Sequence, residues 1–312
     1  MIPPNNDMRF EVTTKCHYNC IICPRAQLTR KKETMSAATF KLIFDRIIAE
    51  TDQYTTLSFP GMGEPLLDNT LEEKIAYAKS ARPNLDVLIL TNASLMTPER
   101  FRRLEEVGVT SIRVSLYGHD YKTYNAVHGT TDKKLYDRIK GYILKALEIR
   151  KKTRILLTLN VVEGVNDAIV NDWIAFWKDR VDLVEVWRPH NWATAKQYRS
   201  VQPVKLKTCN RPFSGPLQIQ ADGTVNICCF DFNGELTIGD LKTQTLEEIF
   251  SSGAYHRIAD RHASGQYEGS HLICENCDQR NADKGDVMIF DSKFDIQERV
   301  KMTSTTYTKV IS

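Results

Sequence analysis

Short apolar runs alternate with longer amphipathic stretches over the first 195 residues of the chain. The short runs are rich in β-branched and aromatic residues, which is typical of strands. They lie at 9–12, 56–59, 87–90, 111–115, 155–162 and 183–187. The stretches between them carry apolar residues at helical spacing, as at 37–50, 69–81, 97–107 and 135–150. Six strand–helix repeats predict an α/β fold with a parallel sheet and right-handed crossovers.

The pattern changes after residue 187, where prolines punctuate short strand-like pieces. Segments 217–220 and 224–227 flank the turn Ala221-Asp222-Gly223 and predict a hairpin. A helix is expected at 245–251, and residues 283–312 are polar, which predicts an extended tail. We therefore expect an α/β domain over residues 1–195, a small α+β domain over 196–282 and a tail over 283–312.

Composition narrows the functional classes. The chain has 312 residues, of which 42% are hydrophobic, and no run approaches the length of a membrane span, so no membrane partner is expected. A net charge of +3 gives no electrostatic reason to expect nucleic acid as a partner. Eight cysteines without a signal peptide indicate a reducing, cytoplasmic location and metal ligation.

Cys16, Cys20 and Cys23 lie close together, directly after the first apolar run. Their C-x3-C-x2-C spacing offers three thiolates to a four-iron cluster and leaves one iron without a protein ligand. Zinc is the alternative, but zinc sites prefer paired C-x2-C units within a compact segment, and the next cysteine is Cys209. The motif resembles the signature of the radical SAM enzymes.

The resemblance implies a fold and a first set of cofactors. Radical SAM enzymes are partial (β/α)6 barrels, and catalytic residues of such barrels lie at the C-terminal ends of strands. In this family the open iron chelates S-adenosylmethionine, and an electron from the cluster cleaves it to a 5′-deoxyadenosyl radical. We therefore expect a 4Fe-4S cluster, S-adenosylmethionine and an electron donor of the flavodoxin or ferredoxin type.

The loop after the second predicted strand reads Gly61-Met62-Gly63-Glu64-Pro65 and resembles the GGEP motif of the family. In the family, backbone groups of this motif hold the amino group of S-adenosylmethionine, and glycines allow the close approach. Ile22 stands where the family often has an aromatic residue before the third cysteine. We expect the Ile22 side chain to pack on the adenine.

Polar residues at the ends of the next strands match further family contacts. By resemblance, Thr91, Asn92 and Ser115 would hold the ribose and the methionyl carboxylate. Asn160 and Val162 would flank the adenine. At the end of the sixth strand, Arg188 could anchor a substrate carboxylate or phosphate and His190 could act as a base, although structural roles fit both residues as well.

A second set of cysteines, Cys209, Cys228, Cys274 and Cys277, offers a complete four-thiolate site. Zinc fits these ligands by softness alone. In the present context the set resembles the twitch domain, a short SPASM domain that holds an auxiliary 4Fe-4S cluster. The stretch 222–233 and the segment 238–241 resemble those of 2-deoxy-scyllo-inosamine dehydrogenases of aminoglycoside biosynthesis.

Cys229 is the eighth cysteine and directly follows a presumed ligand. Successive residues of a strand point to opposite faces, so Cys229 is not expected to bind the same iron as Cys228. Related radical SAM epimerases use a thiol to return a hydrogen atom to the substrate, which makes Cys229 a candidate donor. A buried, unreactive cysteine is the alternative.

The sequence thus favours a radical SAM enzyme that oxidises or epimerises a carbinol carbon of an aminoglycoside or other carbohydrate. A peptide maturase is the second reading; such enzymes often carry an N-terminal recognition domain, and here only about eight residues precede the first strand. A non-enzymatic metal-binding module is the third, and the open iron together with the 61–65 motif counts against it.

Overall fold

A ten-stranded mixed sheet organises the protein, whose computed structural model describes residues 2–202, 205–282 and 287–293. The strands are β1 (Asp7–Phe10), β2 (Thr56–Phe59), β3 (Asp86–Thr91), β4 (Ser111–Ser115), β5 (Arg154–Asn160), β6 (Leu183–Trp187), β7 (Leu217–Ile219), β8 (Thr224–Asn226), β9 (Thr237–Asp240) and β10 (Val287–Ser292).

Nine α-helices and five 3-10 helices accompany the sheet within the described ranges. The α-helices are α1 (Ala37–Glu50), α2 (Leu71–Ala81), α3 (Pro98–Glu106), α4 (Tyr121–His128), α5 (Leu135–Ile149), α6 (Val170–Trp177), α7 (Arg211–Ser214), α8 (Leu246–Phe250) and α9 (Gly253–Ser264). The 3-10 helices are η1 (Pro24–Gln27), η2 (Pro65–Leu67), η3 (Asp167–Ile169), η4 (Ile273–Asn276) and η5 (Asp278–Arg280).

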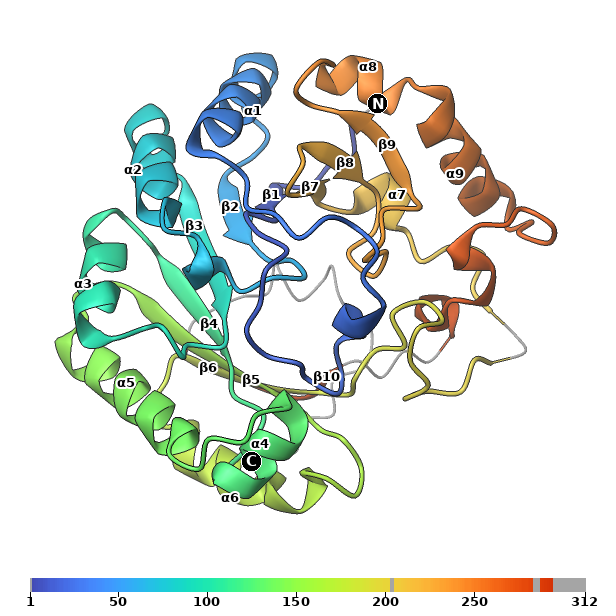
Figure 1. Cartoon of the computed structure of the whole chain (residues 1–312). Coiled ribbons are helices and arrows are strands. Elements are labelled where there is room, and N and C mark those ends of the chain that lie inside the picture. The colour runs from blue at the N-terminus through green and yellow to red at the C-terminus, as the bar shows by residue number, and fades with distance from the viewer. Residues whose placement is uncertain (1, 203–204, 283–286, 294–312) are drawn as a thin grey trace.

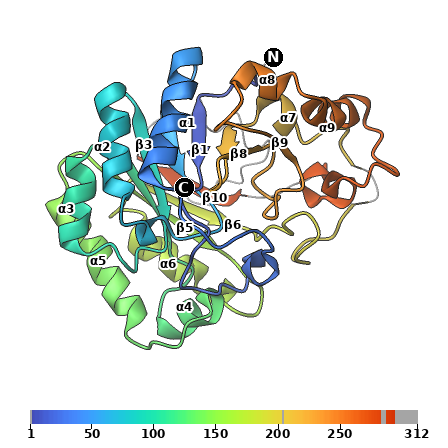
Figure 2. The same ribbon diagram turned by 45° about the horizontal axis from the view of Figure 1, so that its top comes forward.

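Strands β1 to β6 are parallel neighbours in chain order, and the sheet curves without closing. Figures 1 and 2 show helices α1, α2, α3, α5 and α6 on its outer side. This confirms the predicted α/β class and partial barrel. At the other edge, β7 pairs with β1 in parallel and continues as an antiparallel meander through β8 and β9. The sheet therefore continues across the predicted domain boundary near residue 195, from the barrel strands into β7, β8 and β9.

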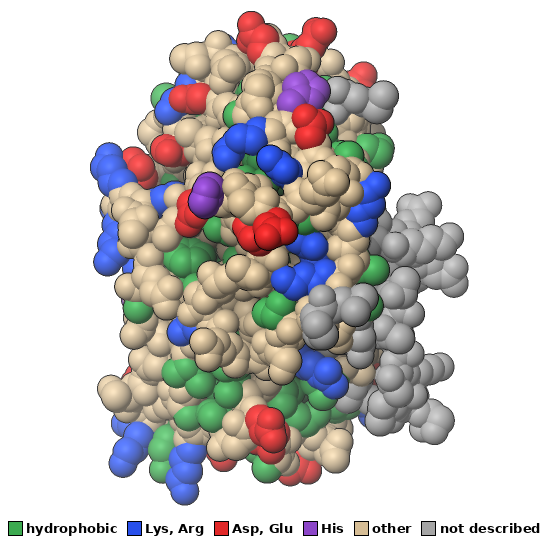
Figure 3. All heavy atoms as spheres, turned by 90° about the vertical axis from the view of Figure 1, so that its right-hand side faces the viewer, with side chains coloured by type: hydrophobic (Ala, Val, Ile, Leu, Met, Phe, Trp, Pro, Cys, Tyr) green, Lys and Arg blue, Asp and Glu red, His purple; other side chains and the backbone are tan. Residues whose placement is uncertain are grey.

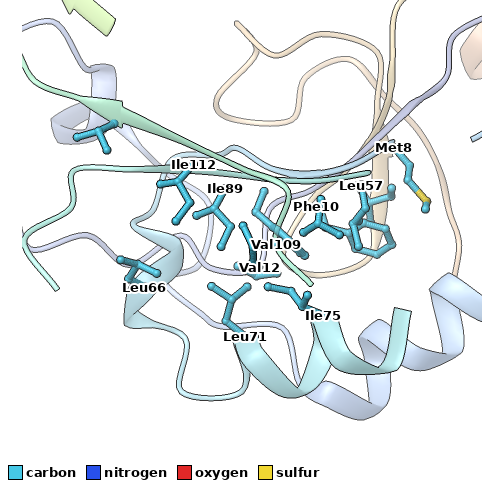
Figure 4. Close-up of a cluster of buried hydrophobic side chains, with 14 of the residues drawn as sticks. Met8, Phe10, Val12, Leu57, Leu66, Leu71, Ile75, Ile89, Val109 and Ile112 are labelled. Atoms are coloured by element: carbon cyan, nitrogen blue, oxygen red, sulfur yellow. The ribbon is translucent and has the colours of Figure 1, made fainter. Parts of the chain in front are cut away.

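Side chains alternate across each barrel strand and so separate a core from a lumen. On β1, Met8 and Phe10 are fully buried, while Arg9 between them faces the opposite side. Figure 4 shows Met8 and Phe10 packed with Leu57 and Ile75 in the apolar layer between the strands and α2. On the opposite side of these strands, Ser58 donates a hydrogen bond to Asp7 and Arg113 pairs with Glu185.

Most predicted elements agree closely with the structure. The strands at 56–59, 111–115 and 183–187 and the helix at 37–50 have the predicted bounds. Thr97 is the N-cap of α3, where its hydroxyl accepts a hydrogen bond from the Arg100 backbone N–H. Helices α4, α6 and α9 were not predicted.

The predicted tail is wrong in one part. Residues Val287–Ser292 form β10, which pairs antiparallel with β6 and extends the barrel sheet by an edge strand. Lys293 follows β10, and its backbone N–H donates a hydrogen bond to the Asp182 carbonyl. The remaining residues of the predicted tail, 283–286 and 294–312, lie outside the described ranges.

Charged side chains of both signs mix on the face that includes α9 and the neighbouring loops. Figure 3 shows Lys and Arg interspersed with Asp and Glu among the described residues of this face. Among the described residues, no helix is both long and apolar enough to cross a lipid bilayer.

Candidate radical SAM and auxiliary cluster sites

The carboxyl ends of β1 to β6 gather the predicted cofactor residues along one edge of the sheet. The first cysteine loop, residues 11–36 between β1 and α1, crosses the middle of the barrel opening in Figure 1. The Gly61–Pro65 motif follows β2, Thr91 ends β3, Ser115 ends β4 and Asn160 ends β5. The parallel order therefore brings these short segments, distant in sequence, to a common mouth.

Three half-buried thiols, those of Cys16, Cys20 and Cys23, share the first cysteine loop. Burial raises the pKa of all three, to about 11 for Cys23, and the neighbouring cysteines add to the rise for Cys20 and Cys23. A metal cluster binds thiolates, so it must displace protons from this loop. The three thiols suit the cluster that the motif implies, with each thiolate on a separate iron.

The Gly61–Pro65 motif packs directly on the first cysteine loop. A Cβ atom on Gly63 would lie 2.1 Å from the Thr13 carbonyl oxygen and 2.7 Å from that of Lys15, so only glycine fits. The Glu64 backbone N–H donates to the same Lys15 carbonyl at 2.8 Å. The motif therefore places its backbone against the residue that precedes the first cysteine.

Glu64 is 3% exposed, and its carboxylate links the loop after β2 to the end of β3. Its oxygens accept hydrogen bonds from Thr91 Oγ1 at 2.5 Å, from the Asn92 backbone N–H at 2.8 Å and from the Leu66 backbone N–H at 3.0 Å. Burial raises the pKa of Glu64, against these hydrogen bonds. Thr91 and Asn92 thus hold Glu64, and their predicted contacts with S-adenosylmethionine stay a prediction.

We expect Glu64→Gln to lower the free energy of unfolding by about 1–3 kcal/mol, because an amide N–H2 would face one of these buried donors. Chemical denaturation of the apoprotein measures this change. The matched change Glu163→Gln, on an exposed loop after β5, should stay within about 0.5 kcal/mol of wild type. Equal stability of the two variants would contradict a stabilising role of the hydrogen bonds that the Glu64 carboxylate accepts.

Tyr117 connects the predicted contacts of β4 and β5. Its hydroxyl lies near the side chains of Ser115 and Asn160, which act against the burial that raises its pKa to about 12. The buried Asn166 amide fixes the same region, because it donates to the Tyr117 and Asn160 carbonyls and accepts from the Val162 backbone N–H. The sequence analysis identified Ser115 and Asn160 but missed Tyr117 and Asn166.

Ile22 and Val162, both predicted beside the adenine, pack together with Val127 in a small apolar cluster. The cluster is separate from the main core and lies against Tyr117 and Cys20. Its position at the mouth suits an apolar ring system, which supports the expected packing of an adenine on aliphatic side chains.

The barrel lumen carries charged residues that the sequence analysis did not single out. Arg113 on β4 pairs with Glu185 on β6 at 2.9 Å, and the other Glu185 oxygen accepts from Trp187 Nε1 at 3.1 Å. At the mouth, Glu11 is buried and receives both terminal nitrogens of Arg30, at 2.7 and 3.0 Å. Of these residues, Glu185 had a signal in the sequence, because it is a charge within the apolar run 183–187.

The two predicted substrate residues differ in their placement. Arg188 is exposed, and its carbonyl accepts a hydrogen bond from Arg199. His190 is half-buried, with its ring 4.5 Å from that of Phe230 and Nδ1 3.5 Å from Gln279 Nε2. The structure therefore places His190, and not Arg188, against the C-terminal region.

Four cysteines from three segments of the chain meet around one pocket. Of the described cysteines, those that line it are Cys209, Cys228, Cys274 and Cys277, the predicted set. Burial raises the pKa of Cys274 and Cys277 to about 12. The Arg211 guanidinium lies among these thiols, and its pKa is raised by their charges against its burial. A cation beside four thiolates suits an anionic cluster.

No group of three His, Cys, Asp or Glu side chains in the described part of the chain is arranged to hold one metal ion. Ligands of one zinc ion crowd around a single centre, whereas the thiolates of a four-iron cluster each bind a different iron. Four thiols are the number of ligands that either a zinc ion or a four-iron cluster takes, so the assignment of a cluster to this pocket stays a prediction.

The expected strand geometry at Cys228 and Cys229 is wrong. Strand β8 ends at Asn226, and the two cysteines lie in a turn, closed by a bond from the Asp231 backbone N–H to the Cys228 carbonyl. Alternation across a strand does not apply there, and the two thiols lie close enough to shift each other's pKa. The neighbouring Cys228 thiol, with the charges of Arg211 and Arg9, lowers the pKa of Cys229.

Comparison with known proteins agrees with both sites. The Radical SAM superfamily model matches residues 10–176, and the model of an iron-sulfur cluster-binding domain, SPASM, matches residues 209–278. S-adenosyl-L-methionine-dependent 2-deoxy-scyllo-inosamine dehydrogenase of Niallia circulans is 22% identical over 272 residues, which cover 86% of this chain and 91% of the dehydrogenase.

A GTP 3′,8-cyclase of Staphylococcus saprophyticus is 23% identical over 205 residues, 62% of this chain and 58% of the cyclase. The chain thus matches little more than half the length of the cyclase.

Two solved structures share the fold. BtrN in complex with AdoMet and 2-DOIA has a TM-score of 0.60 at 18% identity, covering 89% of this chain and 94% of BtrN. SuiB of Streptococcus suis, bound to its precursor peptide SuiA, has a TM-score of 0.64 at 13% identity, covering 98% of this chain and 75% of SuiB. With its superfamily signature matched over more than half of its length, the chain belongs to the radical SAM superfamily.

Proposed function

We propose that the protein is a radical SAM dehydrogenase that oxidises a carbinol carbon of an aminoglycoside-type or other carbohydrate substrate. The observation that carries the proposal is the four-cysteine pocket beside the barrel mouth. Four thiolates would leave no iron open for substrate, which suits a cluster that accepts an electron. Phe230 of this region packs on His190 at the end of β6, so the pocket adjoins the mouth.

The lumen supports a polar substrate. Arg113 on β4 and Glu185 on β6 offer a cation and a carboxylate from the two strands beside β5, which suit hydroxyl and amino groups. Oxidation of C–OH to C=O removes a hydrogen atom from carbon, a proton from oxygen and one electron. Bound S-adenosylmethionine and the clusters supply the hydrogen abstraction and the electron transfer. His190 is the candidate acceptor of the proton.

The test is an anaerobic assay of the reconstituted enzyme with a panel of aminocyclitols, amino sugars and precursor peptides, followed by mass spectrometry. The proposal expects a carbohydrate product lighter by two hydrogen atoms and one 5′-deoxyadenosine per turnover. A modified peptide would favour the maturase reading, for which the fold shared with SuiB is the supporting observation. Failure to form 5′-deoxyadenosine would favour a metal-binding module.

Epimerisation is the second candidate. Cys229 is half-buried, is not among the residues that line the four-cysteine pocket, and lies near enough to Arg9 of β1 for that charge to lower the pKa of the thiol. For the proposed dehydrogenase, we expect Cys229→Ser to retain ketone formation within a few-fold. The matched change Cys228→Ser should remove the auxiliary iron and the ketone together. An epimerase would instead give an isomeric product carrying solvent deuterium, and Cys229→Ser would stop that product while 5′-deoxyadenosine still formed.

A further inference from the structure

The C-terminal end of α4 docks on the first cysteine loop through three successive residues. The Val127 carbonyl accepts the Ile21 backbone N–H at 2.9 Å. A Cβ atom on Gly129 would lie 2.2 Å from the Asn19 carbonyl oxygen, so the two backbones touch. Between these contacts, His128 is 1% exposed and directs its ring at Cys20.

The two ring nitrogens of His128 have different partners. Nε2 lies 3.3 Å from the Tyr117 backbone nitrogen, whose N–H can only donate, so Nε2 must be an unprotonated acceptor. A neutral imidazole then carries its proton on Nδ1. Nδ1 lies 3.3 Å from Cys20 Sγ, within the range of an N–H···S hydrogen bond.

Aromatic rings hold this imidazole in place. The Tyr117 ring stacks on it with a centroid distance of 4.8 Å and an interplanar angle of 5°. Tyr124 and Tyr18 pack against it at 4.1 and 5.5 Å. The donor is therefore fixed both by its helix and by its neighbours, which favours a dedicated contact with the sulfur.

We propose that His128 is a positioning residue whose Nδ1–H bonds the Cys20 sulfur and raises the reduction potential of the cluster bound at Cys16, Cys20 and Cys23. Reduction adds one negative charge to the cluster, and an N–H donor to a ligating sulfur stabilises that added charge. The proposal depends on the first cluster, which family membership implies, and not on the substrate or on the auxiliary site.

The test is an EPR-monitored redox titration of anaerobically reconstituted wild type, His128→Leu and His128→Asn. The first cluster is identified by the signal that changes when S-adenosylmethionine is added. His128→Leu removes the donor and should lower the ratio of reduced to oxidised cluster about tenfold at a fixed potential, a shift of about 59 mV to more negative values. His128→Asn keeps an N–H near the position of Nδ1 and should restore most of this ratio.

Tyr124→Phe is the control, because it removes a hydroxyl of the same aromatic cluster that bonds Tyr18 at 3.2 Å and leaves the sulfur contact intact. The reduction potential of the first cluster in this variant should equal that of wild type. An unchanged potential in His128→Leu with full iron content, or an equal shift in all three variants, would overturn the proposal.

A second measurement needs no variant. Wild type labelled with 15N-histidine, reduced without S-adenosylmethionine, should show a weakly coupled 15N nucleus in the spin-echo modulation of the first cluster. The absence of that coupling would also overturn the proposal, even if His128→Leu failed to fold.

Discussion

Alanine at Cys16, Cys20 or Cys23 is expected to reduce the cleavage of S-adenosylmethionine to background. These residues are the predicted thiolate ligands of the first cluster, and the loop that carries them has no other described cysteine. Loss of one thiolate leaves a second iron without a protein ligand and breaks the arrangement that presents a single open iron. The measurement is 5′-deoxyadenosine formed under anaerobic conditions with a chemical reductant.

The matched change Cys274→Ala, in the second set, should leave this cleavage within about tenfold of wild type, since the two proposed clusters have separate sets of cysteines. Retained cleavage in any of the three variants of the first loop would refute the assignment of the first site. Equal loss in Cys274→Ala would mean that the two sites do not act separately.

Alanine at any pocket cysteine, for example Cys274, is expected to halve the iron content and to abolish substrate oxidation. Two four-iron clusters require about eight irons per chain, and loss of the auxiliary cluster leaves about four. The positive charges of Arg211 and Arg280 lie beside these thiols and favour their thiolate forms. Iron and sulfide analysis, with EPR of the reduced protein, measures the change.

Cys229→Ala is the control for iron content, because Cys228 lines the pocket and its neighbour Cys229 is not among the lining residues. It should keep about eight irons. Unchanged iron in Cys274→Ala, or zinc in place of the second cluster in wild type, would make the pocket a structural site. The proposed route of the electron would then fail.

Local pattern was enough to predict the barrel. Its strands combine an apolar outer face with short length, and helices such as α1 carry a clear apolar stripe, so both periods are visible in the sequence. The cysteine spacings were equally visible, and the structure brings the second set around one pocket as predicted.

Features that depend on distant contacts could not be predicted. Helix α4 is short and largely polar, although Asp120 and Thr123 form a capping box that could have marked its start. Strand β10 has no local signal strong enough to identify its partner β6. The roles of His128 and Glu11 follow from residues that lie far away in sequence, such as Cys20 for the first and Ala221 for the second.

Strand β1 has a consequence for the link between the two cysteine sites. It leads into the first cysteine loop and also pairs with β7, the first strand of the hairpin that leads to Cys228. Glu11, just beyond β1, receives backbone N–H groups from both Met62 and Ala221. The two cysteine sites thus share strand β1 and the buried carboxylate of Glu11. In the proposed enzyme, we therefore expect the distance between the two clusters to stay constant and electron tunnelling between them to be insensitive to solvent viscosity.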